Sequence, residues 1–234
     1  TLVTPGGLVS QGRWTGVPSP RNHPLSPRVR ITADMAYLIG LFISEGHTSG
    51  GKHVGWSFHE KETHLHHAVQ ETLKCVLGME SSKRHHILNH CVQIGVVSKI
   101  LAHTFRASFG AGSLDKHFPQ EWLWELDNTC LSKLLDGIFD GDGYRDSGGN
   151  NARMLTTKSS LLAYQVHAAL MRLGRATSRS SYPDGVWKVR EQTTAAAGEF
   201  NGQGFWHSIS AINQHEFNGE VYNLEVEEDN SYVV

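Results

Sequence analysis

The sequence is poor in cysteine and has no apolar run long enough to span a bilayer. Its 234 residues include three cysteines, at positions 75, 91 and 130. An odd, widely spaced set argues against a disulfide framework and for a reducing compartment, and we expect buried thiols. The longest apolar run, residues 35–43, is far too short to cross a membrane. No secretion signal opens the chain, so we expect an intracellular protein, in the cytoplasm, nucleus or an organelle.

Basic side chains are absent from the C-terminal part of the chain. All 21 Lys and Arg lie at or before Arg190, whereas six of the 23 acidic residues follow position 215. The whole chain has a net charge of −2, but residues 1–215 carry 21 basic and 17 acidic side chains, a net charge of +4. This mildly basic balance is compatible with a nucleic-acid partner and does not establish one.

The order of predicted elements indicates a duplicated unit. Residues 1–31, rich in Gly, Pro and Ser, read as an extended arm or linker. In a first unit, 32–128, periodicity predicts helices over 33–44, 60–79 and 98–109 and strands over 54–58 and 91–97. A second unit, 129–207, repeats the pattern with a helix over 129–143, a strand and helix within 152–174 and a strand over 185–191. Residues 208–234 read as C-terminal strands.

The first helix of each unit carries the same unusual motif. LIGLFISEG at 38–46 and LDGIFDGDG at 135–143 agree at the leucine, both glycines, the phenylalanine and the final acid. An internal glycine costs a helix about 1 kcal/mol, and a carboxylate at its C-terminus costs about 0.3–1 kcal/mol. The glycine and the acid in each motif therefore indicate that each helix interacts with groups outside itself. The two acids are Glu45 and Asp142.

Small residues four apart, Gly40 with Ser44 and Gly137 with Gly141, leave a flat stripe on each helix. Parallel packing of two such stripes would bring both acids to one point. Facing carboxylates repel, and a divalent cation removes the repulsion. Oxygen ligands favour magnesium over zinc, and the last-turn carbonyls of Ser44 and Gly141 are further metal ligands.

Two acids that share metal ions suit phosphodiester hydrolysis. The alternative is that both acids merely cap ordinary core helices. Agreement of the two motifs in register favours the catalytic interpretation.

These two nonapeptides resemble the motif of the LAGLIDADG homing endonucleases, in the single-chain, two-motif form. The resemblance implies an α+β fold of two pseudo-symmetric αββαββα repeats, with paired motif helices and a DNA-binding saddle of antiparallel sheets. It also implies a monomer that cuts both strands of duplex DNA across the minor groove. The motif acids of that family are metal ligands, which corresponds to Glu45 and Asp142 here. Mg²⁺ is the implied cofactor, with Mn²⁺ able to substitute and Ca²⁺ able to bind without supporting cleavage.

The segment DKHFP at 115–119 resembles the Lys-x-Ile-Pro segment of intein-borne members of that family. The resemblance makes Lys116 the basic residue that assists the activated water or the transition-state charge. The equivalent second-repeat position has no basic residue, and Lys188 is the available substitute. Glu60 and Thr157 or Lys158 align with positions that support the metal site.

The tail, GEVYNLEVEEDNSYVV at 219–234, resembles the penultimate block of inteins. An ordinary acidic β-hairpin is the alternative. No N-terminal block with a nucleophilic Cys or Ser and no His-Asn terminus is visible, so we expect this chain not to splice by itself. The open alternatives to an intein-derived endonuclease are a DNA- or RNA-binding maturase or regulator without cleavage, and a protein-splicing fragment.

DNA contacts are expected from the strands, with Lys and Arg on phosphates and alternate polar residues on base edges. The candidates are Lys52, Ser57, Lys83, Arg84, His86, Gln93, Arg145, Arg153, Lys158, Arg179 and Arg190.

Overall fold

The computed structural model describes residues 2–3, 28–86, 90–145, 152–191, 199–200, 205–206, 212–214 and 216–220. Most of the predicted arm, 1–31, and most of the predicted intein-like tail, 219–234, lie outside these residues. Two short antiparallel pairs flank the main body. They are β1 (Leu2–Val3) with β2 (Arg28–Val29), and β11 (Glu199–Phe200) with β12 (Phe205–Trp206).

The first repeat runs in the order αββαββα. Its helices are α2 (Ala33–Glu45), α3 (Thr63–Leu77) and α4 (Lys99–Phe109), and its strands are β3 (Gly46–Ser49), β4 (His53–His59), β5 (Ser82–His86) and β6 (Cys91–Val97). The strands form an antiparallel sheet in the order β3-β4-β6-β5. Side chains at alternate positions, including Val54, Trp56 and Ile94, are buried against the helices, which leaves the other face of the sheet open.

The second repeat follows a short helix, α5 (Trp122–Glu125), and runs in the same order as far as it is described. It comprises α6 (Asn128–Asp142), β7 (Gly143–Arg145), β8 (Arg153–Thr157), α7 (Ser160–Arg172), β9 (Thr177–Ser181) and β10 (Trp187–Glu191). Its sheet has the order β7-β8-β10-β9, equivalent to the order of the first sheet. The predicted α+β architecture of two related repeats is confirmed.

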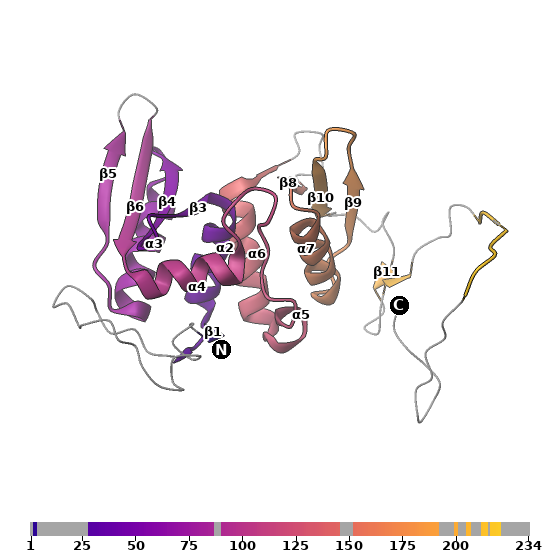
Figure 1. Ribbon diagram of the computed structural model, residues 1–234, viewed down its shortest axis with the longest axis horizontal. Helices are drawn as coiled ribbons and strands as arrows, with labels where there is room; N and C mark the ends of the chain where they lie inside the picture. The colour runs from indigo at the N-terminus through magenta and orange to yellow at the C-terminus, as the bar shows by residue number, and fades with distance from the viewer. Residues whose placement is uncertain are drawn as a thin grey trace.

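Helices α2 and α6 pack side by side at the centre, with one sheet on either side (Figure 1). A Cβ on Gly40 would lie 2.9 Å from the Gly137 Cα and would clash with the Leu134 carbonyl oxygen. A Cβ on Gly137 would clash in turn with the Tyr37 carbonyl oxygen. The two backbones are therefore in direct contact, which explains the glycine inside each motif helix.

Local sequence signals account for where these helices begin. Thr32, Ser98, Asp127 and Ser159 precede α2, α4, α6 and α7, and each side chain accepts a hydrogen bond from a backbone N–H in the first turn. The predicted bounds of the long helices and of strands β4, β6 and β10 agree with the structure within three residues. The short polar strands β3, β5, β7 and β9 and the helix α5 were not predicted.

Two further expectations can be compared with the structure. All three cysteines are free, but Cys75 is exposed and Cys91 is partly exposed, so the prediction of buried thiols holds only for Cys130. The reason is position: Cys75 lies in the last turns of α3, away from its buried residues. Within the described ranges, no helix is long and apolar enough to cross a membrane.

The glycine contact predicts a large packing cost for a single methyl group. We expect Gly137→Ala to lower the free energy of unfolding by about 1–3 kcal/mol, because the Cβ meets fixed backbone on α2. This loss occurs although alanine favours an isolated helix by about 1 kcal/mol. Urea titration monitored by circular dichroism measures the change.

Gly112→Ala is the control for that substitution, because among the described residues a Cβ there would come within 4 Å of one neighbour, a carboxylate oxygen of Asp115 at 3.3 Å. A Gly137→Ala protein as stable as the control would contradict the described backbone contact.

Candidate active site

Both motif helices end at an acid followed by a glycine, and the next strand starts at that glycine. Gly46 donates its N–H to the Phe42 carbonyl, and Gly143 donates to the Phe139 carbonyl. A Cβ at either glycine would clash with that same carbonyl oxygen. The glycine after each acid is thus required by a tight change from helix to strand, which fixes the acid at the helix end.

The two helix ends lie next to each other. A Cβ on Gly141 would clash with the Ser44 side chain and would lie 3.2 Å from the Glu45 Cγ. The Ser44 hydroxyl lies 3.2 Å from the carbonyl oxygens of Gly40 and Leu41 in its own helix. Because position 40 faces 137 and position 44 faces 141, the helices run in the same direction and bring both acidic ends together.

Burial acts on both carboxyl groups, and repulsion by neighbouring acids acts on Glu45. Burial raises the pKa of Glu45 to about 7, and the negative charges of Asp142 and Glu62 act in the same direction. Burial also raises the pKa of Asp142, while the charge of Lys116 lowers it. Ionisation of the two carboxyl groups therefore costs free energy in the absence of a cation. A bound cation would lower that cost.

Lys116 reaches the same place from the segment between the repeats. Its Nζ donates to the Phe42 carbonyl at 2.9 Å and to the Gly46 carbonyl at 2.8 Å, and it lies 4.6 Å from the centre of the Phe42 ring. Burial lowers the pKa of Lys116 to about 8, although Asp142, Asp115 and Glu45 favour its charged form. The ammonium therefore caps the C-terminus of α2 and stands beside both acids.

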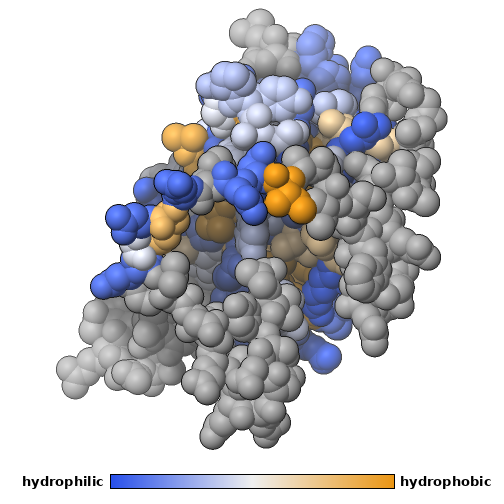
Figure 2. All heavy atoms as spheres, turned by 90° about the vertical axis from the view of Figure 1, so that its right-hand side faces the viewer, coloured by the Kyte–Doolittle hydropathy of each residue, from blue (hydrophilic) through white to orange (hydrophobic). Residues whose placement is uncertain are grey.

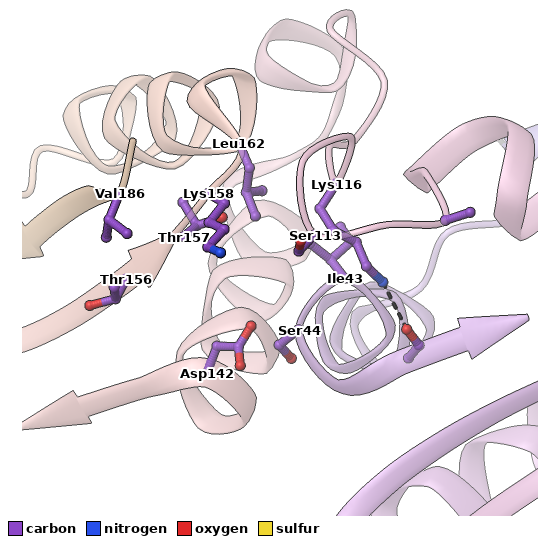
Figure 3. Close-up of a pocket in the computed structure, with 12 residues that line it drawn as sticks. Ile43, Ser44, Ser113, Lys116, Asp142, Thr156, Thr157, Lys158, Leu162 and Val186 are labelled. Carbon is purple, nitrogen blue, oxygen red and sulfur yellow. Dashed lines mark hydrogen bonds between the residues drawn. The ribbon is translucent and has the colours of Figure 1, made fainter. Parts of the chain in front are cut away.

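A cavity of about 560 Å³ opens beside this point, on the side of the second repeat (Figure 3). Ser44, Lys116 and Asp142 line one side of it, and Thr157 and Lys158 line the other. Figure 3 shows these side chains coming from α2, the inter-repeat segment, α6 and the end of β8. The cavity is thus bordered by one helix-end acid and two lysines.

The donor set suits a hard, oxygen-binding cation. Among the residues that the structure describes, no group of three or more His, Cys, Asp or Glu could enclose a metal ion. The site instead offers two carboxylates and backbone carbonyls. Magnesium is typically held by one or two carboxylates, retained waters and substrate phosphates, so the residues present fit it.

Strand register sorts the predicted DNA contacts by face. Ser57, Gln93 and Arg84 are register partners across β4, β6 and β5, and His86 pairs with Cys91 on the same face. This face is opposite to the buried residues of β4 and β6 and is therefore open. In the second sheet, Lys188 and Arg190 lie on the open face, since Val189 between them is buried. Lys52 lies in the exposed turn between β3 and β4.

Four of the predicted contacts lie on the opposite, helix-facing side instead. Lys83 pairs with the buried Ile94 and lines a pocket beside α3. Arg179 pairs with the buried Val189 and lies over the rings of Tyr164 and Trp187, at 5.5 and 5.2 Å. Both side chains thus lie on the side of the sheet that faces the helices, because successive residues of a strand point to opposite faces.

Arg153 is the third residue on the helix-facing side. Its guanidinium donates to Glu191 at 2.5 Å and to Asp136 at 2.9 Å, and it lies over the Phe139 ring. A half-buried arginine held by two carboxylates acts as a structural link between α6 and β10 rather than as a phosphate ligand. Arg145 is its register partner on β7 and so shares that side of the sheet.

The residues predicted to support the site are separated by the structure. Lys188 lies on the open face with its Nζ 4.8 Å from the centre of the Tyr182 ring and does not line the cavity, whereas Lys158 does. Glu60 accepts a hydrogen bond from His90 at 2.8 Å. Sequence reasoning missed His47, which follows Glu45 by two residues on the unpredicted strand β3.

Comparison with known proteins agrees with this geometry. Residues 32–110 match the model of the LAGLIDADG-like domain family. A solved structure of a mesophilic variant of the homing endonuclease I-DmoI superposes with a TM-score of 0.52 at 15% identity, over 70% of this chain and 91% of that one. The chain has the LAGLIDADG homing-endonuclease fold. The structure of I-DmoI in complex with DNA and Mn gives a TM-score of 0.51 at 15% identity, with the same coverage.

Curated relatives of this chain are larger proteins, and their names have little in common. An iron-sulfur cluster assembly SufBD family protein of Mycobacterium bovis is 28% identical over 96% of this chain. The ATP-dependent DNA helicase Hel308 of Thermococcus kodakarensis is 26% identical over 87%, and a DNA polymerase of the same organism is 26% identical over 70%. The chain spans only 29%, 21% and 10% of these three relatives.

The end of the LAGLIDADG fold that carries the second repeat is predominantly hydrophilic in its described part (Figure 2). Figure 2 shows its apolar atoms as small separate groups among hydrophilic ones, and Leu161, Tyr164 and Tyr182 are among the exposed large side chains of the second repeat. The described surface there suits solvent or a polar partner.

The raised pKa of Glu45 predicts how stability changes with pH. Glu45 binds its proton more tightly in the folded state, so its favourable contribution is complete below about pH 4.5 and is lost as pH rises through about 7. We therefore expect Glu45→Gln to be more stable than wild type at pH 8 without metal, with the difference shrinking toward pH 5. Urea unfolding across this range measures it.

Glu121→Gln removes an exposed carboxylate and is the control for that comparison. Added Mg²⁺ should stabilise only proteins that keep Glu45. A pH-independent difference between wild type and Glu45→Gln would show that the carboxyl is not electrostatically strained.

Proposed function

We propose that this protein is a site-specific endonuclease that hydrolyses both strands of duplex DNA, with Mg²⁺ as its cofactor. The observation that carries the proposal is the meeting of two acidic helix ends, each followed by a glycine turn, with the buried Lys116 beside them and an open sheet on either side. A merely structural pair of capping acids would not need to be buried beside each other. We propose that the protein acts as a monomer, since one chain supplies both acids. We also propose that it acts inside the cell.

The proposed chemistry assigns distinct tasks to the residues present. Glu45 and Asp142, with the carbonyls of Ser44 and Gly141, would hold the divalent ions, which supply a nucleophilic water and stabilise the leaving oxygen. Lys116 is positioned to stabilise negative charge beside Asp142, because it lines the same cavity. Its lowered pKa, about 8, also allows it to exchange a proton near neutral pH.

The fold supports duplex DNA as the substrate. Two antiparallel sheets flank the acidic helix ends (Figure 1). By strand register and burial, their open faces carry Arg84, Gln93, Lys188 and Arg190. A β-ribbon can enter the major groove, and open-face side chains can then reach base edges. The phosphates that cross the helix ends would lie between the two sheets, next to the acids.

We further propose that the chain derives from an intein. Its curated relatives include an iron-sulfur cluster assembly protein, a helicase and a DNA polymerase, which share no common activity in their names, and each of these matches over less than a third of its length. A segment found inside such different proteins is expected of a mobile element. The tail that resembles an intein block lies mostly outside the described residues, and splicing stays a prediction for the larger protein.

Cleavage and binding can be separated by isosteric substitution. We expect the wild-type protein with Mg²⁺ to cut discrete members of a randomised duplex library and to leave short 3′ overhangs. Glu45→Gln and Asp142→Asn should each reduce cleavage at least 100-fold while DNA affinity, measured by gel shift in Ca²⁺, stays within about threefold.

Glu121→Gln is the control and should cut normally, since its side chain is exposed at the start of α5. Tight, sequence-selective binding with no cleavage in Mg²⁺ or Mn²⁺ would instead identify a maturase or regulator that has kept the fold. Absence of any DNA binding would contradict both functions.

We propose that Lys158, which lines the cavity, is the second basic group, rather than Lys188, which does not line it. We expect Lys158→Met to slow cleavage of one strand about 10-fold or more, because it removes the cation that faces Asp142 across the cavity. Lys188→Met should weaken DNA binding and lower its salt dependence without favouring one strand. Strand-specific end labels on a cleaved duplex distinguish the two results, and equal effects on both strands would remove Lys158 from the site.

A further inference from the structure

The open face of the first sheet contains a hydrogen bond that passes over a whole strand. His47 lies on β3 and Gln93 on β6, and these strands are separated by β4. The Gln93 Nε2 and the His47 Nε2 are nevertheless 2.8 Å apart. Adjacent strands are about 4.8 Å apart, so the imidazole must lie across β4 to make this contact.

Glycine on β4 makes this crossing possible. Gly55 is the register partner of His47, and a Cβ there would lie 2.8 Å from both Cε1 and Nε2 of the His47 ring. Gly95 pairs with Gly55 on β6, and a Cβ on it would lie 2.6 Å from the His53 Nε2. The two paired glycines thus leave a surface without side chains, over which the imidazoles of His47 and His53 lie with their centres 6.0 Å apart and their planes tilted by 30°.

The chemistry of the two nitrogens fixes the direction of the hydrogen bond. An amide nitrogen has no acceptor lone pair, so Gln93 donates and the unprotonated His47 Nε2 accepts. The donation uses one of the two amide hydrogens of Gln93. The amide oxygen and the other N–H remain available, and the His47 contact holds the amide plane in one orientation.

Such an amide matches the edge of one base. Adenine presents an N7 acceptor and an N6 amino donor in the major groove, and a glutamine amide meets both at once. Gln93 also lies between Ser57 and Arg84 on the open face, with Arg84 available to a neighbouring phosphate. A pre-oriented amide loses less rotamer entropy on binding, which sharpens the discrimination.

We infer that Gln93, oriented by His47 across Gly55, reads one adenine in the major groove of the half-site bound by the first sheet. This inference rests on the proposed DNA-binding function and adds the base that is read and the residue that positions the reader. His47 acts as a positioning residue, and Gly55 provides the space that its ring requires.

Selection of bound duplexes from a randomised library in Ca²⁺, followed by sequencing, tests the inference. The wild-type protein should enrich adenine at one position of the first half-site, by about 5- to 150-fold over the other bases. Gln93→Ala should abolish the preference at that position alone. The preferences at all other positions should stay unchanged.

Variants of His47 and Gly55 distinguish a loss of the Gln93 orientation from a loss of folding. His47→Ala should weaken the same preference, and His47→Gln should restore part of it, because its amide oxygen can accept from Gln93. Gly55→Ala should resemble His47→Ala, since its methyl group displaces the ring and cannot itself read a base. Lys83→Ala is the control, because it changes a residue one strand away on the helix-facing side. Thermal unfolding shows which variants are folded. If Gly55→Ala does not fold, the comparison of His47→Ala with the wild-type protein still tests the inference.

The outcomes distinguish this inference from the proposed function. An enriched wild-type site that is unchanged by Gln93→Ala, or a lost preference for a base other than adenine, would overturn the inference and leave DNA binding intact. A wild-type protein that enriches no sequence at all would overturn both. A change at several positions on Gln93→Ala would also overturn it, because it would indicate a general structural effect.

Discussion

The contact between two helix backbones at Gly40 and Gly137 is the constraint on which the rest of the structure depends. It sets the separation of α2 and α6, and through them the placement of the two sheets. Helices usually pack at 8–10 Å between axes, with side chains in the interface. Here the absence of a Cβ at two facing positions permits direct backbone contact, and the small residues one turn later carry it to the helix ends.

The electrostatics of the site follow from that close contact. Helix C-termini carry partial negative charge, and two of them side by side with two carboxylates make an unfavourable arrangement. The described structure relieves part of it with the ammonium of Lys116, which donates to two carbonyls at the end of α2. Burial and repulsion remain large enough to raise the pKa of Glu45 to about 7. The two acids therefore lower the stability of the folded protein, as is common where a protein holds a ligand or a reacting group.

The features that could be predicted from the sequence are those that depend on local patterns. Caps such as Thr32 and Ser98, apolar periodicity and the repeated motif determine the long helices and the central strands. The edge strand β5 was missed because all five of its residues are exposed, so it has no alternation to detect. Register is a tertiary property, and for that reason the sequence did not show that Lys83, Arg153 and Arg179 lie on the helix-facing side of their sheets. The positions of Lys158 and His47 depend in the same way on contacts between distant segments.

Both acids and the lysine between them come from three separate stretches of the chain, and Lys116 precedes the second motif acid by more than twenty residues. A nascent chain that ends after the first repeat has one acid, an unmatched glycine stripe and no second sheet. The complete constellation exists only when translation of the second repeat is finished and the helices have docked. Under the proposed function, such a partial product lacks the second acid and the second sheet, and therefore cannot hold a duplex and cut both of its strands.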